Sequence, residues 1–241
     1  MTKNSQSAKM LIALMATAGV AALGWAAANW QSADLVRFAS FLVVTILASR
    51  LKISLPGLNG NMSVNLPFIL IGMVELSGPE AVVLAGASTL VQCWPVGAKG
   101  SKPVQMLFNI ANMMAAVAVA SLVFQQVMHR SLLGESLGLA VATVAFLVAD
   151  TVPVAGIISL TEAPTFVKVW GEILLLTFPY FVLSAGVAGL VSAGSHYVGW
   201  QAPLLVLPVM YGVYRSFNVY FGRTRQMMQS EETFTSSAAA D

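Results

Sequence analysis

The stretch that decides the fold runs from residue 51 to residue 96: LKISLPGLNGNMSVNLPFILIGMVELSGPEAVVLAGASTLVQCWPV. It contains two apolar runs, 66–76 and 81–91, and the helix breaker Gly78-Pro79 lies between them. Each run has 11 residues, whereas a helix needs about 20 residues to cross about 30 Å of hydrocarbon. We therefore expect two short helices that form a bent hairpin inside a membrane. Irregular backbone at that depth is tolerated only in protein or beside a watery cavity, so other helices must surround it.

The residues just before these runs alternate in polarity. Met62, Val64 and Leu66 are apolar, and Ser63 and Asn65 between them are polar. This period of two favours a short extended segment over a helix. Short hydrophobic segments interrupted by Gly or Pro are also the best sequence indicator of a binding site in a membrane protein.

The composition is typical of an integral membrane protein. Hydrophobic residues make up 57% of the 241 residues and charged residues 9%, and the mean hydropathy is +0.79. Too few polar side chains remain to cover a soluble globule of this size. We therefore expect the lipid bilayer as a partner. The formal net charge is +2 and the sequence has no basic stripe, so we expect no binding to nucleic acid. The single cysteine, Cys93, excludes an intramolecular disulfide and a cysteine-based metal cluster.

The hydropathy pattern predicts an all-α polytopic bundle of about 7–8 helical segments, with the hairpin counted among them. Outside the hairpin, the expected spans are 10–30, 35–51, 104–128, 137–160, 166–193 and 203–220. A polar cytoplasmic leader, 1–9, precedes a single membrane domain, 10–222. The first span is long for a signal peptide, although its basic flank and Ala26-Ala27-Ala28 imitate one. Residues 223–241 lack apolar periodicity and are expected to form a disordered cytoplasmic tail.

The basic residues predict the orientation of the chain. With a cytoplasmic N-terminus, ten of them fall inside and two, Arg37 and Arg130, fall outside. The ten are Lys3, Lys9, Arg50, Lys52, Lys99, Lys102, Lys168, Arg215, Arg223 and Arg225. This excess follows the positive-inside rule, so we expect both termini inside, in a bacterial inner membrane.

Polar residues at membrane depth are the candidates for function, because a charged group costs about 2.5 kcal/mol or more at the centre of a span. Gln105, Asn109 and Asn112 recur at i, i+4 and i+7 and predict one polar stripe. The stripe faces a ligand or water, or it forms hydrogen bonds between helices. Asp150 is the acidic residue placed most clearly inside a span, and Pro153 loosens the backbone one turn later.

Other charged residues suggest contacts between segments. Lys168 and Glu172 lie four residues apart, which permits an ion pair on one helix face. We predict that Arg215 compensates Asp150 or Glu172 and couples the last helix to the bundle. Glu75 and Glu80 flank the hairpin bend. Glu80 either stabilises a helix N-terminus just after a proline or guards an entrance with Glu75. The predicted ligand-binding residues are Asn65, Glu75, Gln92, Gln105, Asn109, Asn112 and Asp150.

Nothing in the sequence supports an enzyme. His129 and His196 both fall at span ends, and the HExxH, GxSxG, P-loop and paired-cysteine patterns do not occur. We therefore expect no catalytic residue, no bound metal and no cofactor.

Four stretches resemble a bacterial membrane-associated sensor domain, namely 54–94, 103–119, 146–192 and 199–223. The motifs that carry the resemblance are PGxxGxMSVN, ELSxPE, LVQC, TEA, FPY and YRS. The matching positions are Pro56, Gly57, Gly60, Met62, Ser63, Asn65, Glu75, Pro79, Glu80, Gln92, Asn109, Pro153, Glu162, Pro179, Tyr180, Tyr214 and Arg215. Such domains precede GGDEF cyclases or HD-GYP phosphodiesterases of cyclic-di-GMP signalling, so the resemblance implies signal input. In those proteins the last helix continues into an output domain, whereas 18 residues follow Arg223 here. We expect a separate cytoplasmic signalling partner or a homo-oligomer.

Three functions stay open. The first is sensing of an unknown small-molecule ligand in a cavity between the hairpin and the helices that carry Asn109 and Asp150. The second is a small transporter or substrate-capture subunit, because the hairpin and its preceding loop are similar in pattern to the capture subunits of energy-coupling-factor vitamin transporters. The third is an accessory or scaffold subunit with no ligand. Loss of uptake on deletion favours the second function, and a well-packed interior without a cavity favours the third.

Overall fold

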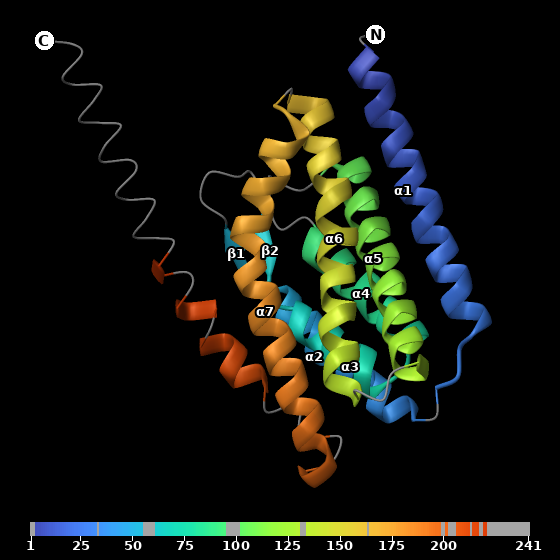
Figure 1. The fold of residues 1–241 in the computed structure, drawn as a ribbon, viewed down its shortest axis with the longest axis vertical. Coiled ribbons are helices and arrows are strands. Elements are labelled where there is room, and N and C mark those ends of the chain that lie inside the picture. The colour runs from blue at the N-terminus through green and yellow to red at the C-terminus, as the bar shows by residue number, and fades with distance from the viewer. Residues whose placement is uncertain are drawn as a thin grey trace, which may run out of the picture.

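The protein is described here from a computed structural model (Figure 1). The structure describes residues 3–32, 34–54, 61–94, 102–130, 134–162, 164–198, 201, 206–212, 214–216 and 219–220. The elements are α1 (Lys3–Ala28), α2 (Leu35–Ser49), β1 (Lys52–Ser54), β2 (Asn61–Ser63), α3 (Leu66–Glu75), α4 (Gly78–Cys93), α5 (Pro103–Arg130), α6 (Gly134–Glu162) and α7 (Phe166–Val198). Beyond α7, residues 206–212, 214–216 and 219–220 are helical. The predicted helical bundle is confirmed, and the predicted tail, 223–241, lies outside the described residues.

Four of these helices have the length and apolar composition of membrane spans. The candidate spans are Gln6–Ala28 of α1, Pro103–His129 of α5, Gly134–Glu162 of α6 and Phe166–Ser195 of α7. They agree with four of the predicted spans and fit a multi-pass membrane protein. The described part of the predicted leader, 3–9, is helical and continues into the first span as α1.

The helix predicted at 35–51 is present but shorter than predicted, and it is not among the four candidate spans. This helix, α2, ends at Ser49 after 15 residues, which is about 22 Å of rise and less than the thickness of the hydrocarbon. The chain continues instead into β1, which pairs antiparallel with β2. The ladder joins Lys52 to Ser63, and the Val64 N–H donates to the Leu51 carbonyl at 3.1 Å. The extended segment expected near Met62 is therefore confirmed as far as Ser63.

The predicted pair of short helices is also confirmed. α3 has 10 residues and α4 has 16. Ser77 caps α4, since its Oγ accepts from the Glu80 N–H at 3.3 Å and donates to Glu80 Oε2 at 2.8 Å. Pro79 lies in the first turn, where a missing N–H costs nothing. The capping alternative for Glu80 is thus correct, and this cap fixes the bend between α3 and α4.

Other helices surround α3 as expected. Its side chains from Leu66 to Met73 are all buried, and α3 packs against α2, α4, α6 and α7. Figure 1 shows α2, α3 and the β1–β2 pair behind the long helices, with the strands beside the middle of α7. A Cβ atom on Gly72 would lie 2.7 Å from Leu84 Cδ1, so the missing side chain lets α3 and α4 approach closely. We call α3, α4 and the β1–β2 pair the re-entrant unit.

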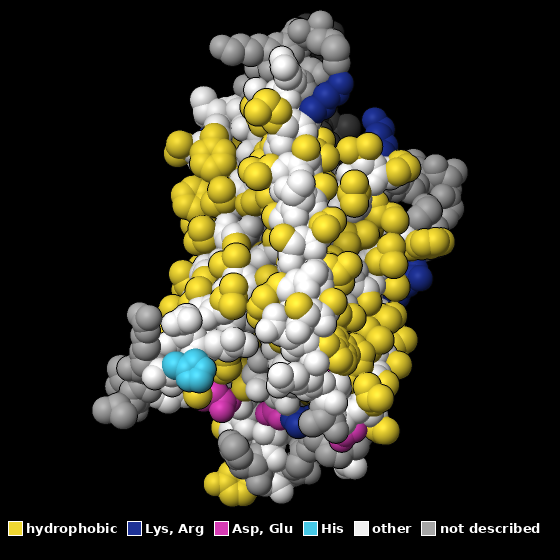
Figure 2. Space-filling model, turned by 90° about the vertical axis from the view of Figure 1, so that its right-hand side faces the viewer, with side chains coloured by type: hydrophobic (Ala, Val, Ile, Leu, Met, Phe, Trp, Pro, Cys, Tyr) yellow, Lys and Arg dark blue, Asp and Glu magenta, His cyan; other side chains and the backbone are white. Residues whose placement is uncertain are grey.

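α1 covers the opposite side of the bundle, where it packs against α4, α5 and α6. A Cβ atom on Gly19 would lie 2.6 Å from Ala111 Cα, so the backbones of α1 and α5 are in close contact there. Figure 2 shows a broad hydrophobic band, with Asp and Glu side chains at one end and Lys and Arg side chains at both ends. An apolar band between two charged ends is the surface that a hydrocarbon layer requires.

Candidate functional site

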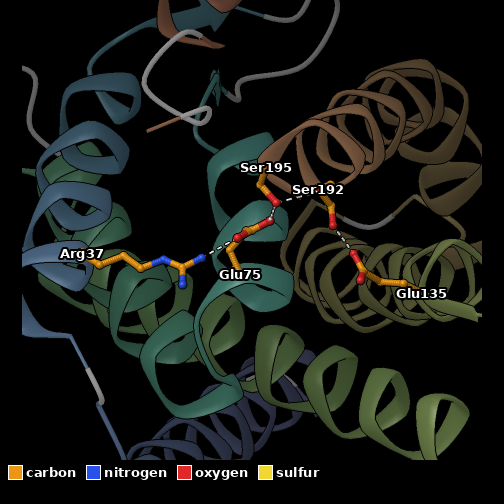
Figure 3. A network of polar contacts seen from close by, with 5 residues as sticks. All are labelled: Arg37, Glu75, Glu135, Ser192 and Ser195. Atoms are coloured by element: carbon orange, nitrogen blue, oxygen red, sulfur yellow. Dashed lines mark hydrogen bonds and ion pairs between the residues drawn. The ribbon is translucent and has the colours of Figure 1, made fainter. Parts of the chain in front are cut away.

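Polar side chains inside the bundle form three groups, and the first lies at the hairpin bend (Figure 3). Glu75, at the end of α3, forms an ion pair with Arg37 of α2. Arg37 follows a local cap, because Asp34 Oδ1 accepts from the backbone N–H groups of Val36 and Arg37 at 3.0 Å. The side chains of Arg37 and Glu75 are 27% and 9% exposed. An exposed pair contributes about 0–1 kcal/mol, and partial burial strengthens the attraction but adds a cost of desolvation.

Two serines of α7 extend this group to α6. Ser195 Oγ lies 2.6 Å from Glu75 Oε1, to which it donates, and 2.8 Å from the Ser192 carbonyl. Ser192 Oγ in turn donates to Glu135 Oε1 at the start of α6. We call Arg37, Glu75, Ser195, Ser192 and Glu135 the bend network. It joins α2, α3, α6 and α7 at one end of the bundle, and Glu75 is its only member among the predicted ligand-binding residues.

The second group, the central cluster, lies between the re-entrant unit and the middle of α7. Ser63 Oγ donates to Asn65 Oδ1, and Asn65 Nδ2 donates to Ser88 Oγ at 3.0 Å. The Tyr180 hydroxyl donates to the Ser63 carbonyl at 3.0 Å.

α3 begins without a side-chain cap. Asn65 occupies the N-cap position, but its φ of −85° and ψ of −16° are helical and its side chain makes no cap bond. The phenol of α7 holds the chain at Ser63, just before this helix begins. Asn65 is a buried residue bonded within the protein on both sides of its amide, which is what a structural contact requires.

The third group joins α5 to α6. Asn112 Nδ2 donates to Asp150 Oδ1 at 2.8 Å and to the Asp150 carbonyl at 3.1 Å. Next to it, Trp170 Nε1 of α7 donates to Thr151 Oγ1 at 3.1 Å, and Thr151 Oγ1 donates to the Leu147 carbonyl at 2.6 Å. The structure thus brings together two of the predicted site residues, Asn112 and Asp150.

The predicted polar stripe on α5 is divided among different surroundings. Gln105 is exposed, Asn109 is half-buried and Asn112 is buried. Asn109 Nδ2 lies 3.7 Å from the sulfur of Cys93 on α4, and Asn112 bonds to α6. The contacts of Asn109 and Asn112 favour the alternative in which the stripe binds neighbouring helices. Gln92 is half-buried on α4.

The predicted contacts of Lys168, Glu172 and Arg215 do not form. All three side chains are exposed, and within the described ranges the one ion pair is that of Arg37 with Glu75. Asp150 turns toward α5 and takes an amide as its partner, so Arg215 does not compensate it. The coupling role of these residues stays a prediction. Over the part of the chain that the structure describes, no three His, Cys, Asp or Glu side chains form a group that could hold a metal.

Sequence reasoning missed Arg37, Glu135, Ser192, Ser195 and Tyr180. Two signals were present. The count of basic residues assigned Arg37 to the outer side, and the hairpin bend with Glu75 also faces that side because both ends of the hairpin lie inside. Tyr180 belongs to the FPY motif.

Comparison with known proteins adds no family to this description. A scan against protein-family models, a search of curated proteins and a search of solved structures found no match. The function of the chain is therefore inferred from the three polar groups and the re-entrant unit.

Proposed function

We propose that this chain is a signal-input module of a bacterial inner membrane, with both termini inside. In this proposal a small-molecule ligand binds beside the re-entrant unit, and α7 transmits the resulting change of packing to a cytoplasmic partner or to a second copy of the chain. The observation that carries the proposal is the attachment of α7 to the re-entrant unit at two depths. The ten-to-two distribution of basic residues supports the orientation.

The two attachments lie far apart on one helix. Tyr180, in the middle of α7, bonds to Ser63, and Ser195, near the end of α7, bonds to Glu75. These positions differ by 15 residues, or about 22 Å along a helix. A helix held at two such points follows a displacement of the unit as a rigid body. At the start of α7, beyond Pro179, Trp170 bonds to Thr151 of α6, and we expect a displacement of α7 to alter this contact.

The re-entrant unit is the part of the fold suited to a ligand. Short helices and a strand pair present backbone at membrane depth, and interrupted segments of this kind form the substrate sites of many membrane proteins. A ligand acts on such an element only if it binds one packing better than the other. The proposal therefore requires both binding and a change in the position of α7.

Binding is tested by thermal unfolding of the purified full chain in detergent against vitamins, quinones, lipids and short-chain metabolites. A ligand at 100 times its Kd stabilises the folded state by about 2.7 kcal/mol. Loss of transport of the hit on gene deletion, with no change in signalling output, would favour the substrate-capture function. Absence of any hit across the library would favour the scaffold.

Movement is tested with spin labels in lipid nanodiscs. Because Cys93 is the only cysteine, a Cys93→Ser background permits labels at Lys102, before α5, and at Lys168, on α7. We expect the hit to change the distance between the labels in the parent protein. Tyr180→Phe should retain binding and reduce the change, whereas Tyr211→Phe, an exposed tyrosine, should leave it intact. An unchanged distance in the parent protein with bound ligand would contradict the proposal.

A further inference from the structure

The Asn112–Asp150 contact holds a buried acceptor that lacks a donor. Asn112 is 2% exposed, and its Nδ2 donates twice to Asp150. Its Oδ1 is buried and has no hydrogen-bond partner among the residues that the structure describes. A buried amide oxygen left without a donor is costly, and such an atom in a native structure calls for a missing partner.

Asp150 is the neighbour that can acquire a donor. An ionised carboxylate only accepts hydrogen bonds, whereas a protonated one carries an O–H. Asn112 Nδ2 already lies 2.8 Å from one carboxyl oxygen of Asp150. An amide and a carboxylic acid pair through two hydrogen bonds in a ring, with the amide N–H on the acid carbonyl and the acid O–H on the amide oxygen.

No basic side chain among the described residues forms an ion pair that would neutralise the Asp150 carboxylate. α5 carries its titratable residues, His129 and Arg130, at its last two positions, and Glu75 of α3 already pairs with Arg37. The remaining charged residues of the helices around Asp150 are Lys3 and Lys9 of α1, Glu135 and Glu162 of α6, and Lys168 and Glu172 of α7. The structure does not describe the side chain of Lys3, and none of the others forms an ion pair with Asp150.

From this geometry we propose that Asp150 binds a proton inside the bundle and donates it to Asn112 Oδ1. The site consists of the Asp150 carboxyl of α6 and the Asn112 carboxamide of α5, and its ligand is a proton taken from water. Uptake forms one O–H bond on the carboxylate and removes its negative charge, and no other bond changes. Release reverses the step, leaves a charge in the span and breaks the acid–amide ring between α5 and α6. This inference does not depend on the proposed ligand response.

The test is infrared spectroscopy of the full chain in lipid at neutral pH. The carbonyl stretch of a protonated carboxylic acid is separate from the bands of a carboxylate. We expect such a band in the parent protein, its loss in Asp150→Asn, and its retention in two controls. Glu80→Gln removes a buried acid and Glu172→Gln removes an exposed one. Asn112→Leu should shift the band to higher frequency, because the acid O–H then loses its acceptor.

Isotope labelling keeps the test independent of whether Asp150→Asn folds. The chain has three aspartates, Asp34, Asp150 and Asp241, and Asp34 is an exposed helix cap. Labelling the aspartate carboxyls with carbon-13 in an Asp241→Asn chain should therefore shift the band. A band that does not respond to the label would overturn the proposal. Stabilisation of the parent protein by Na⁺ or K⁺, with no acid band at neutral pH, would also overturn it and identify a cation site.

Discussion

The bond between Tyr180 and the re-entrant unit gives the sharpest test of the fold. Tyr180 is 2% exposed, and Tyr180→Phe keeps the ring and removes the hydroxyl. The Ser63 carbonyl, just before α3, then loses the partner that Tyr180 supplies. An unsatisfied buried polar group costs about 1–3 kcal/mol. Hydrogen bonds in membrane bundles contribute about 0.6 kcal/mol on average, because the unfolded chain also finds partners there.

From these figures we expect Tyr180→Phe to lower the free energy of unfolding by about 1 kcal/mol. The assay is reversible unfolding in mixed micelles by a graded increase of denaturing detergent, followed by tryptophan fluorescence. Tyr211→Phe is the matched control, since Tyr211 is 49% exposed. If both variants were equally stable, the phenol of Tyr180 would not hold α3, and the two-point attachment of α7 would fail.

Three further predictions concern the re-entrant unit. A double-mutant cycle of Arg37→Met and Glu75→Gln should give a coupling free energy of about 1 kcal/mol in the unfolding assay, and an additive cycle would remove the ion pair from the bend network. Gly72→Ala should destabilise by about 1–3 kcal/mol because its Cβ would lie 2.7 Å from a leucine of α4. Gly24→Ala, with nothing within 4 Å of the added atom, should be neutral or stabilising in the same measurement. Ser77→Ala should cost about 1 kcal/mol by removing the cap of α4, and unchanged protection of the α4 amides in hydrogen exchange would contradict this.

The sequence was sufficient to predict the helices that depend on local length and local breakers. The run at 66–76 is too short to span, and Gly78-Pro79 stops it, so the hairpin follows from residues adjacent in the chain. The same logic overestimated the length of the helix at 35–51. An apolar run of that length is compatible with a span, but the chain leaves the helix at Ser49 and forms β1. The strand that pairs with it, β2, lies outside the segment from which the helix was predicted.

Local periodicity also could not assign the polar partners. It predicted that Asn112 and Asp150 lie within long apolar helices, but not that they meet, because their contact joins residues 38 apart. It placed Lys168 and Glu172 on one face of a helix, but both point outward and make no ion pair in the described structure. Spacing along one helix fixes which side chains share a face. The direction of that face depends on how the helix is rotated against its neighbours.

The sequence by itself determined that this is a helical bundle with apolar spans and a broken hairpin, because hydropathy, length and helix breakers act over a few turns of chain. Only the tertiary structure decided which groups meet. Glu75 finds Ser195 at a separation of 120 residues, and Tyr180 finds Ser63 at 117. Such bonds form where burial removes water from polar groups and packing brings a distant partner within reach.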